Sequence, residues 1–211
     1  MTRSGSIYVI VFAALAVGRL TAQAHGEECK EFQGSSPEAL STFLQTAAPA
    51  FDDPNCIAFA LRALGNQRYV PATEVVSKFL DFRRPKTDEE KQGLYLHPQG
   101  IDQLYPATYA LEMIGRDALP VVLSAIKSST SSQSARQNAV FVWMAIQRDD
   151  SPKAVAALVR EAERAPDPFS RQNLEWAAYR ALIWCNPPDE VQCKAAVSGL
   201  KPGLTSALGN R

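Results

Sequence analysis

Small and apolar residues recur in pairs, four residues apart, at four places between residues 55 and 193. Residues with this spacing share one face of an α-helix, so each copy predicts an amphipathic helix. The four copies are Cys56-Ile57 with Ala60-Leu61, Pro106-Ala107 with Ala110-Leu111, Asn138-Ala139 with Val142-Trp143, and Ala177-Ala178 with Ala181-Leu182. Self-similarity of this kind predicts a helical repeat, in which stacked units share one core.

A second amphipathic helix is expected after each copy. Its apolar positions are Val75, Val76, Phe79 and Leu80, then Leu119, Val122, Leu123 and Ile126, then Val155, Leu158 and Val159, and last Val191, Ala195 and Ala196. The expected ends of the first helices are Gly65, Gly115, Gln147 and Asn186. Gly and Asn tolerate the left-handed backbone that often follows a helix. No segment alternates apolar and polar residues between hairpin turns, so no sheet is expected.

The predicted fold class is therefore all-α, an α-solenoid of antiparallel helix pairs with about four repeats and an N-terminal cap helix. Ser36-Pro37-Glu38 predicts the start of that cap helix, because it places a capping hydroxyl, a proline and an acid in the preferred order. The same cap-then-proline signal recurs at Asp53-Pro54 and at Asp150-Ser151-Pro152. The segment 25–54 carries the cap helix, 55–200 forms the repeat domain, and 201–211 is a C-terminal tail.

Two of the units resemble a known repeat family. Ala60-Leu61-Arg62-Ala63-Leu64-Gly65 and Ala110-Leu111-Glu112-Met113-Ile114-Gly115 resemble HEAT repeats, and the following Ala118-Leu119-Pro120 resembles the PBS-lyase HEAT-like kind. The resemblance covers roughly residues 56–196 and specifies a fold better than a function. The stretch 80–85 is similar to a segment of uncharacterised exported bacterial HEAT-repeat proteins.

The first 24 residues have the layout of a secretory signal peptide. A weakly basic start at Arg3 precedes an apolar run over residues 7–17, and Ala22-Gln23-Ala24 provides an A-x-A cleavage site. The run is shorter than the roughly 20 residues that a membrane-spanning helix needs. We expect cleavage after Ala24 and a periplasmic or secreted protein without a membrane segment; an uncleaved anchor is the alternative.

The four cysteines, Cys29, Cys56, Cys185 and Cys193, all follow that site. An even number in an exported protein favours disulfides, and three pairings are possible. Cys185 and Cys193 flank a short turn, so their side chains could meet, which leaves Cys29 to pair with Cys56. Free core thiols are the alternative, and a zinc site is disfavoured because there is no C-x-x-C pair.

An insertion over residues 83–104 interrupts the array, and long connections of this kind are often functional. Thr87-Asp88-Glu89-Glu90 predicts a short extra helix within it. Arginine and tyrosine are enriched at binding hot spots, so the predicted partner-binding surface joins the insertion to the neighbouring second helices. Its candidate residues are Arg83, Arg84, Tyr95, His97 and Tyr105. The alternative is that both tyrosines only pin the loop to the core.

Little in the chain points to catalysis. Only His25 and His97 are present, and there is no G-x-S-x-G elbow, P-loop or H-E-x-x-H motif. Ser124-Ala125-Ile126-Lys127 matches S-x-x-K, but without S-D-N and K-T-G it is read as a coincidence. No metal or cofactor is expected.

The balance of charged residues helps to choose between a nucleic-acid and a protein partner. Lys and Arg number 22, as do Asp and Glu, so there is no electrostatic reason to expect nucleic acid. Charged residues of both signs on the second helices suit a protein or peptide partner. The favoured function is an exported, non-catalytic scaffold for protein–protein interaction. An enzyme or enzyme accessory, by analogy with HEAT-like lyases, is the alternative.

Overall fold

The computed structural model describes residues 29–93 and 100–200, so the predicted signal peptide and C-terminal tail lie outside the described residues. Within them the regular structure is helical, with no strand. The α-helices are α1 (Pro37–Thr46), α2 (Pro54–Asn66), α3 (Thr73–Ser77), α4 (Asp88–Lys91), α5 (Ile101–Leu104), α6 (Pro106–Ile114), α7 (Leu119–Lys127), α8 (Gln133–Ile146), α9 (Ser151–Glu163), α10 (Pro168–Ala181) and α11 (Glu190–Val197). Short 3-10 turns join several of them, the first being η1 (Lys30–Phe32). The predicted all-α class is confirmed.

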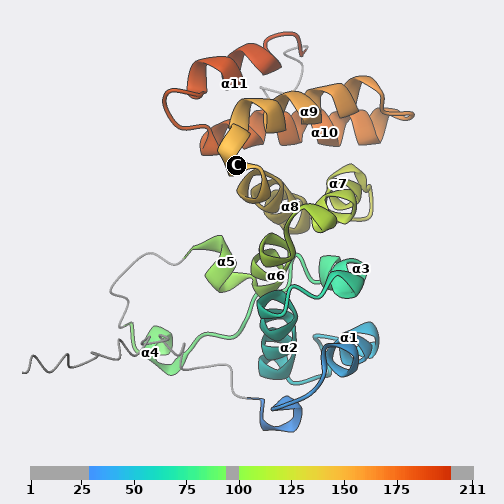
Figure 1. Cartoon of the computed structure of the whole chain (residues 1–211), viewed down its shortest axis with the longest axis vertical. Helices are drawn as coiled ribbons and strands as arrows, with labels where there is room; N and C mark the ends of the chain where they lie inside the picture. Colours follow the sequence, from blue (N-terminus) through green and yellow to red (C-terminus); the bar gives the residue numbers. More distant parts are fainter. Residues whose placement is uncertain (1–28, 94–99, 201–211) are drawn as a thin grey trace, which may run out of the picture.

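The helices are stacked along the long axis of the molecule, from α1 and α2 at one end to α11 at the other (Figure 1). The packed neighbours along this axis are α1 with α2, α3 with α6, α7 with α8, and α9 with both α10 and α11. The first helices of successive copies also touch, because α6 packs against α2 and against α8, which in turn contacts α10. Each layer therefore buries apolar surface against the next.

Local signals in the sequence explain where the helices begin. The Ser36 hydroxyl accepts a hydrogen bond from the Ala39 amide at 3.3 Å, and Asp53 and Asp150 cap α2 and α9 in the same way. Such caps satisfy amides that have no partner in the first turn of a helix. All three predicted cap-then-proline starts are confirmed, as is the short helix α4, which begins with a capping box at Thr87.

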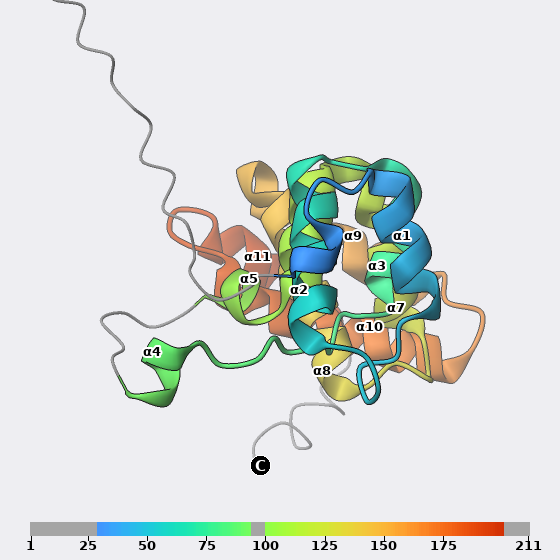
Figure 2. The ribbon, with the colours of Figure 1, turned by 90° about the horizontal axis from the view of Figure 1, so that it is seen from below.

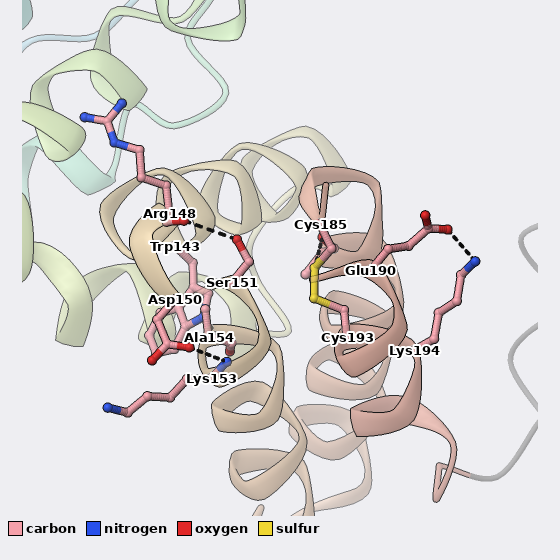
Figure 3. Close-up of a disulfide and its surroundings, with 11 residues drawn as sticks. Trp143, Arg148, Asp150, Ser151, Lys153, Ala154, Cys185, Glu190, Cys193 and Lys194 are labelled. Atoms are coloured by element: carbon pink, nitrogen blue, oxygen red, sulfur yellow. Dashed lines mark hydrogen bonds and ion pairs between the residues drawn. A yellow bond between two sulfur atoms is a disulfide. The ribbon is translucent and has the colours of Figure 1, made fainter. Parts of the chain in front are cut away.

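The shared core forms at the positions that the repeat pattern predicts. Leu61 and Leu111 are fully buried, and Trp143 occupies the matching position of the third copy with 6 % of its surface exposed. The indole of Trp143 donates a hydrogen bond to the Ala154 carbonyl at 3.0 Å, which joins α8 to α9 (Figure 3). Trp143 is thus a core residue, because its polar edge is satisfied inside the protein.

Two disulfides close the two ends of the stack. Cys29 is bonded to Cys56, which ties the segment before α1 to α2. Cys185 is bonded to Cys193, which ties the end of α10 and its following turn to α11 (Figure 3). Both pairings suggested by the sequence are present, and the four cysteines are buried.

The register of α11 differs from the prediction. Val191 is 76 % exposed and Ala195 is also exposed, whereas Cys193 and Val197 are buried. The reason is the bond between Cys193 and Cys185, which turns that face of the helix inward. The short apolar run contained two possible faces, and the prediction chose the wrong one.

The predicted helix end at Gly65 is also wrong. Gly65 lies inside α2, which continues to Asn66, and the left-handed residue beyond the helix is Arg68, with φ 49°. A β-carbon on Gly65 would come within 2.7 Å of the Ala110 Cα, so the glycine is there to let α2 and α6 approach closely. Gly115, in contrast, follows α6 with φ 84°, as expected of a helix end.

Gly65→Ala should therefore destabilise the protein, although the same change in an open helix would stabilise it by about 1 kcal/mol. The added methyl group meets backbone that cannot rotate away, and overpacking of this kind costs about 1–3 kcal/mol, which exceeds the gain. Urea unfolding followed by circular dichroism measures the effect. Gly199→Ala is the matched control, because nothing lies within 4 Å of its added methyl group. An equal midpoint for Gly65→Ala and the wild type would contradict the close approach.

Candidate functional site: a groove along α1, α3 and α7

Three adjoining hollows follow α1, α3, α7 and the start of α10, and we call them together the α1–α3–α7 groove. The first and second hollows share Lys78 and Asp81, and the second and third share Ser124 and Ser128. Their volumes are about 630, 500 and 400 Å³. Because neighbouring hollows share lining residues, they lie next to one another along the molecule.

The first hollow is mainly apolar and lies between α1, the connection from α1 to α2, and the segment after α3. Its lining residues are Leu44, Gln45, Ala47, Pro49, Pro54, Lys78, Phe79, Asp81, Phe82, Arg83 and Pro85. Leu44, Phe79 and Phe82 are buried, so they form its floor. Phe51, in the same connection as Pro49, is 91 % exposed. Concave, largely apolar surfaces with a few polar groups are typical binding sites.

Two cations stand at the edge of the first hollow, and their side chains have no partner among the described residues. Lys78 and Arg83 are exposed, and neither side chain forms a hydrogen bond or an ion pair with another residue in 29–93 or 100–200. The carboxylate of Asp81, in contrast, accepts a hydrogen bond from the Ser132 hydroxyl at 2.9 Å. That hydrogen bond leaves Asp81 negatively charged, so the lining of the first hollow carries two cations and one anion, and its net charge is positive.

The second hollow is lined by hydroxyl groups and by the charged side chains of Glu74, Lys78 and Asp81. The hydroxyl groups come from α3, α7 and the connection to α8, namely Ser77, Ser124, Ser128, Thr130, Ser131 and Ser132. Several are used internally, since Ser128 and Thr130 are hydrogen-bonded at 2.8 Å and Ser132 caps α8. Within the described chain, the hydroxyls of Ser124 and Ser131 have no such partner. This part of the groove offers both donors and acceptors to a ligand.

The third hollow lies between α7 and the start of α10, and Phe169 on its lining is 68 % exposed. Lys127, which also lines it, forms an ion pair of 2.6 Å with Glu161 of α9. Hydrogen bonds from the backbone amide and then the hydroxyl of Ser170 hold the pKa of Asp167 below its usual range. Ser124 and Lys127 of the S-x-x-K match both line this hollow, but the ammonium group of Lys127 is paired with Glu161.

Arg84 has a role inside the insertion. Its guanidinium contacts both carboxylate oxygens of Glu90, at 2.5 and 3.0 Å, and the two side chains are 8 % and 5 % exposed. It also donates to the Gln103 carbonyl at 2.7 Å, and Arg62 donates to the same oxygen at 3.0 Å. Arg84 therefore fastens the two ends of the insertion to each other.

The structure separates the other predicted binding residues. Arg83 lines the first hollow, whereas Tyr105 is half-buried at the junction of α5 and α6. In both views α4 and α5 lie on one side of α2, and α1 and α3 lie on the other (Figure 1 and Figure 2). Tyr95 and His97 lie outside the described residues. Among the described members of the predicted set, only Arg83 belongs to the groove.

Sequence reasoning missed two parts of the groove. One is the connection from α1 to α2, where Pro49 and Pro54 form a wall of the first hollow. The other is the run of five hydroxyl residues over 128–132, which supplies four of the six hydroxyl side chains that line the second hollow. That run was visible in the sequence as a polar stretch between two apolar helices, which is also the composition of an ordinary loop.

Residues 29–93 and 100–200 contain neither a cluster of metal-binding side chains nor a helix suited to a membrane. No group of three or more His, Cys, Asp or Glu side chains is placed to hold a metal ion. None of the helices in this part of the chain has the length and apolar character that crossing a membrane requires.

Comparisons with protein-family models, curated proteins and solved structures find no match to this chain. The HEAT-like character of the repeats accordingly stays a prediction.

Proposed function

We propose that this protein is an exported, non-catalytic scaffold that binds a protein partner along the α1–α3–α7 groove. The observation that carries the proposal is the adjacency of the three hollows, which share lining residues from one to the next. A long groove of mixed polarity suits a polypeptide better than a compact substrate, because it offers contacts over a length that only a chain can follow.

The arrangement of helices supports an α-solenoid as the framework. HEAT-like units would place their second helices in one row, and α3 and α7 line the groove as such a row would. Stacked repeats commonly use an extended concave surface of this kind for binding. The two disulfides and the signal-like sequence over residues 1–24 support an oxidising compartment outside the cytoplasm.

The test is capture of partners from an envelope extract by the immobilised mature chain, compared with a variant that blocks the groove. Ser124 is exposed and lines two hollows, so Ser124→Arg should obstruct the groove without disturbing the core. We expect one dominant protein to be captured by the wild type and lost with Ser124→Arg. Protein recovered from the envelope or the medium should begin at His25.

Ser198→Arg is the matched control, because it adds the same side chain at an exposed serine at the far end of the stack. Capture that survives Ser124→Arg would contradict binding in the groove. A small molecule that stays tightly bound, with no protein partner, would instead support the enzyme or accessory alternative.

A further inference from the structure

The first hollow combines two features that the proposed function does not itself require. Its floor and walls are apolar, formed by Leu44, Phe79 and Phe82 with three prolines around them. Its edge carries two exposed cations, Lys78 and Arg83, whose side chains form no ion pair with a described residue. Asp81 is the one carboxylate of the same lining, so the hollow keeps a net positive charge. An occupant that satisfies both features has an apolar group directly beside a negative charge.

The neighbouring hollow indicates what kind of molecule carries that group. Lys78 and Asp81 line both hollows, so a ligand that leaves the apolar one along the groove enters the hydroxyl-lined one. There it meets the unpaired hydroxyls of Ser124 and Ser131, which match the amide and carbonyl groups of a peptide backbone. A small amphipathic acid would fill the first hollow and leave this continuation unused.

We propose that the groove binds an extended, acidic segment of the partner, with one large apolar side chain held in the first hollow. The inference rests on the proposed function and adds the chemistry of the segment. Successive side chains of an extended chain point in opposite directions, so a leucine or phenylalanine enters the hollow while flanking Asp or Glu side chains reach outward. Those carboxylates pair with Lys78 and Arg83 at the edge, where charge complementarity selects among apolar segments.

The experiment selects binders from a phage library of random peptides of about nine residues, a length of roughly 30 Å when extended. Enriched sequences should contain a large apolar residue with Asp or Glu beside it. For a synthetic peptide of the enriched sequence, Lys78→Glu/Arg83→Glu should raise the Kd at least about tenfold, which corresponds to roughly 1.4 kcal/mol. Salt should weaken binding to the wild type but not to this variant, because added ions screen attraction in the wild type and repulsion in the charge-reversed protein.

Two further variants distinguish the contribution of the apolar hollow from that of the cations at its edge. Ala47→Leu narrows the first hollow from its wall and should weaken the peptide while leaving the cations in place. Lys153→Glu/Arg116→Glu changes the net charge equally at exposed sites that line none of the three hollows, so it should leave the Kd within about twofold of the wild type. Circular dichroism confirms that each variant keeps its helical content.

Several outcomes would overturn the inference. These are enrichment of basic peptides, enrichment of peptides without an apolar anchor, failure of the library to enrich any sequence, and equal weakening by the control pair. Saturable binding of decanoate in the first hollow with no peptide binding would assign the site to a small amphipathic acid. If capture of a partner still depends on Ser124 while these peptide results fail, the inference fails and the proposed function stands.

Discussion

Leu111→Ala should lower the free energy of unfolding by about 2–5 kcal/mol, the usual range for removing a buried leucine side chain. Leu111 is fully buried on α6, at the centre of the stack. Helix α6 packs against α2, α3 and α8, so a cavity there removes contacts from several layers at once. The upper part of the range is expected, because helices fixed on several sides collapse poorly into the vacated space.

The measurement is the free energy from urea unfolding, with the slope of the transition checked for two-state behaviour. Val191→Ala is the control, since its side chain is 76 % exposed and should change stability by less than about 0.5 kcal/mol. If Leu111→Ala left the midpoint unchanged, the repeat register of the core would be wrong. A large loss of stability with Val191→Ala would show that this side chain is buried, as the sequence pattern predicted. It would contradict the register of α11 seen in the structure.

The helices could be predicted because their signals are local. A capping side chain, a proline and an apolar stripe act within a few residues, as at Ser36-Pro37 and Asp53-Pro54. The predicted core positions Leu61, Leu111 and Trp143 are also buried in the structure. Periodicity over four copies gave the register of these helices more support than any single copy could.

The errors arise where a distant contact decides between two local possibilities. Gly65 matched a helix end, but its proximity to Ala110 shows that it permits the packing of α2 on α6. In α11 the weak apolar pattern did not fix a face, and the bond from Cys193 to Cys185 did. Such choices depend on which surface lies opposite, and that information is spread over the whole chain.

The candidate site was harder to predict than the fold for the same reason. The first hollow joins Pro49 and Pro54 to residues 78–85, and the second joins α3 to the connection before α8. A hydrogen bond from the Ser132 hydroxyl to Asp81 spans 51 positions of the sequence. Arg84 shows the opposite case, because its partner Glu90 is only six positions away and its charge is already satisfied within the insertion.

Removing the disulfide between Cys29 and Cys56 should have an effect of similar size to Leu111→Ala. The two residues are 27 positions apart, and closing a loop of that length is worth about 3.5 kcal/mol in the chain-entropy model. The loop contains all the residues of η1 and α1, so in the unfolded chain the bond limits how far this segment can move from Cys56. Cys29→Ala/Cys56→Ala should therefore lower the urea midpoint strongly under non-reducing conditions.

Cys185→Ala/Cys193→Ala provides the internal comparison, because its loop spans only 8 positions and corresponds to about 2.5 kcal/mol in the same model. The larger loss for the longer loop is the specific expectation, and removal of both bonds should destabilise more than either pair alone. Reductant should shift the midpoint of the wild type but not that of the variant lacking all four cysteines. A wild-type midpoint that is the same with and without reductant would show that neither bond stabilises the folded protein. The reverse order of the two losses would indicate that contacts in the folded ends, and not the constraint on the unfolded chain, determine what each bond contributes.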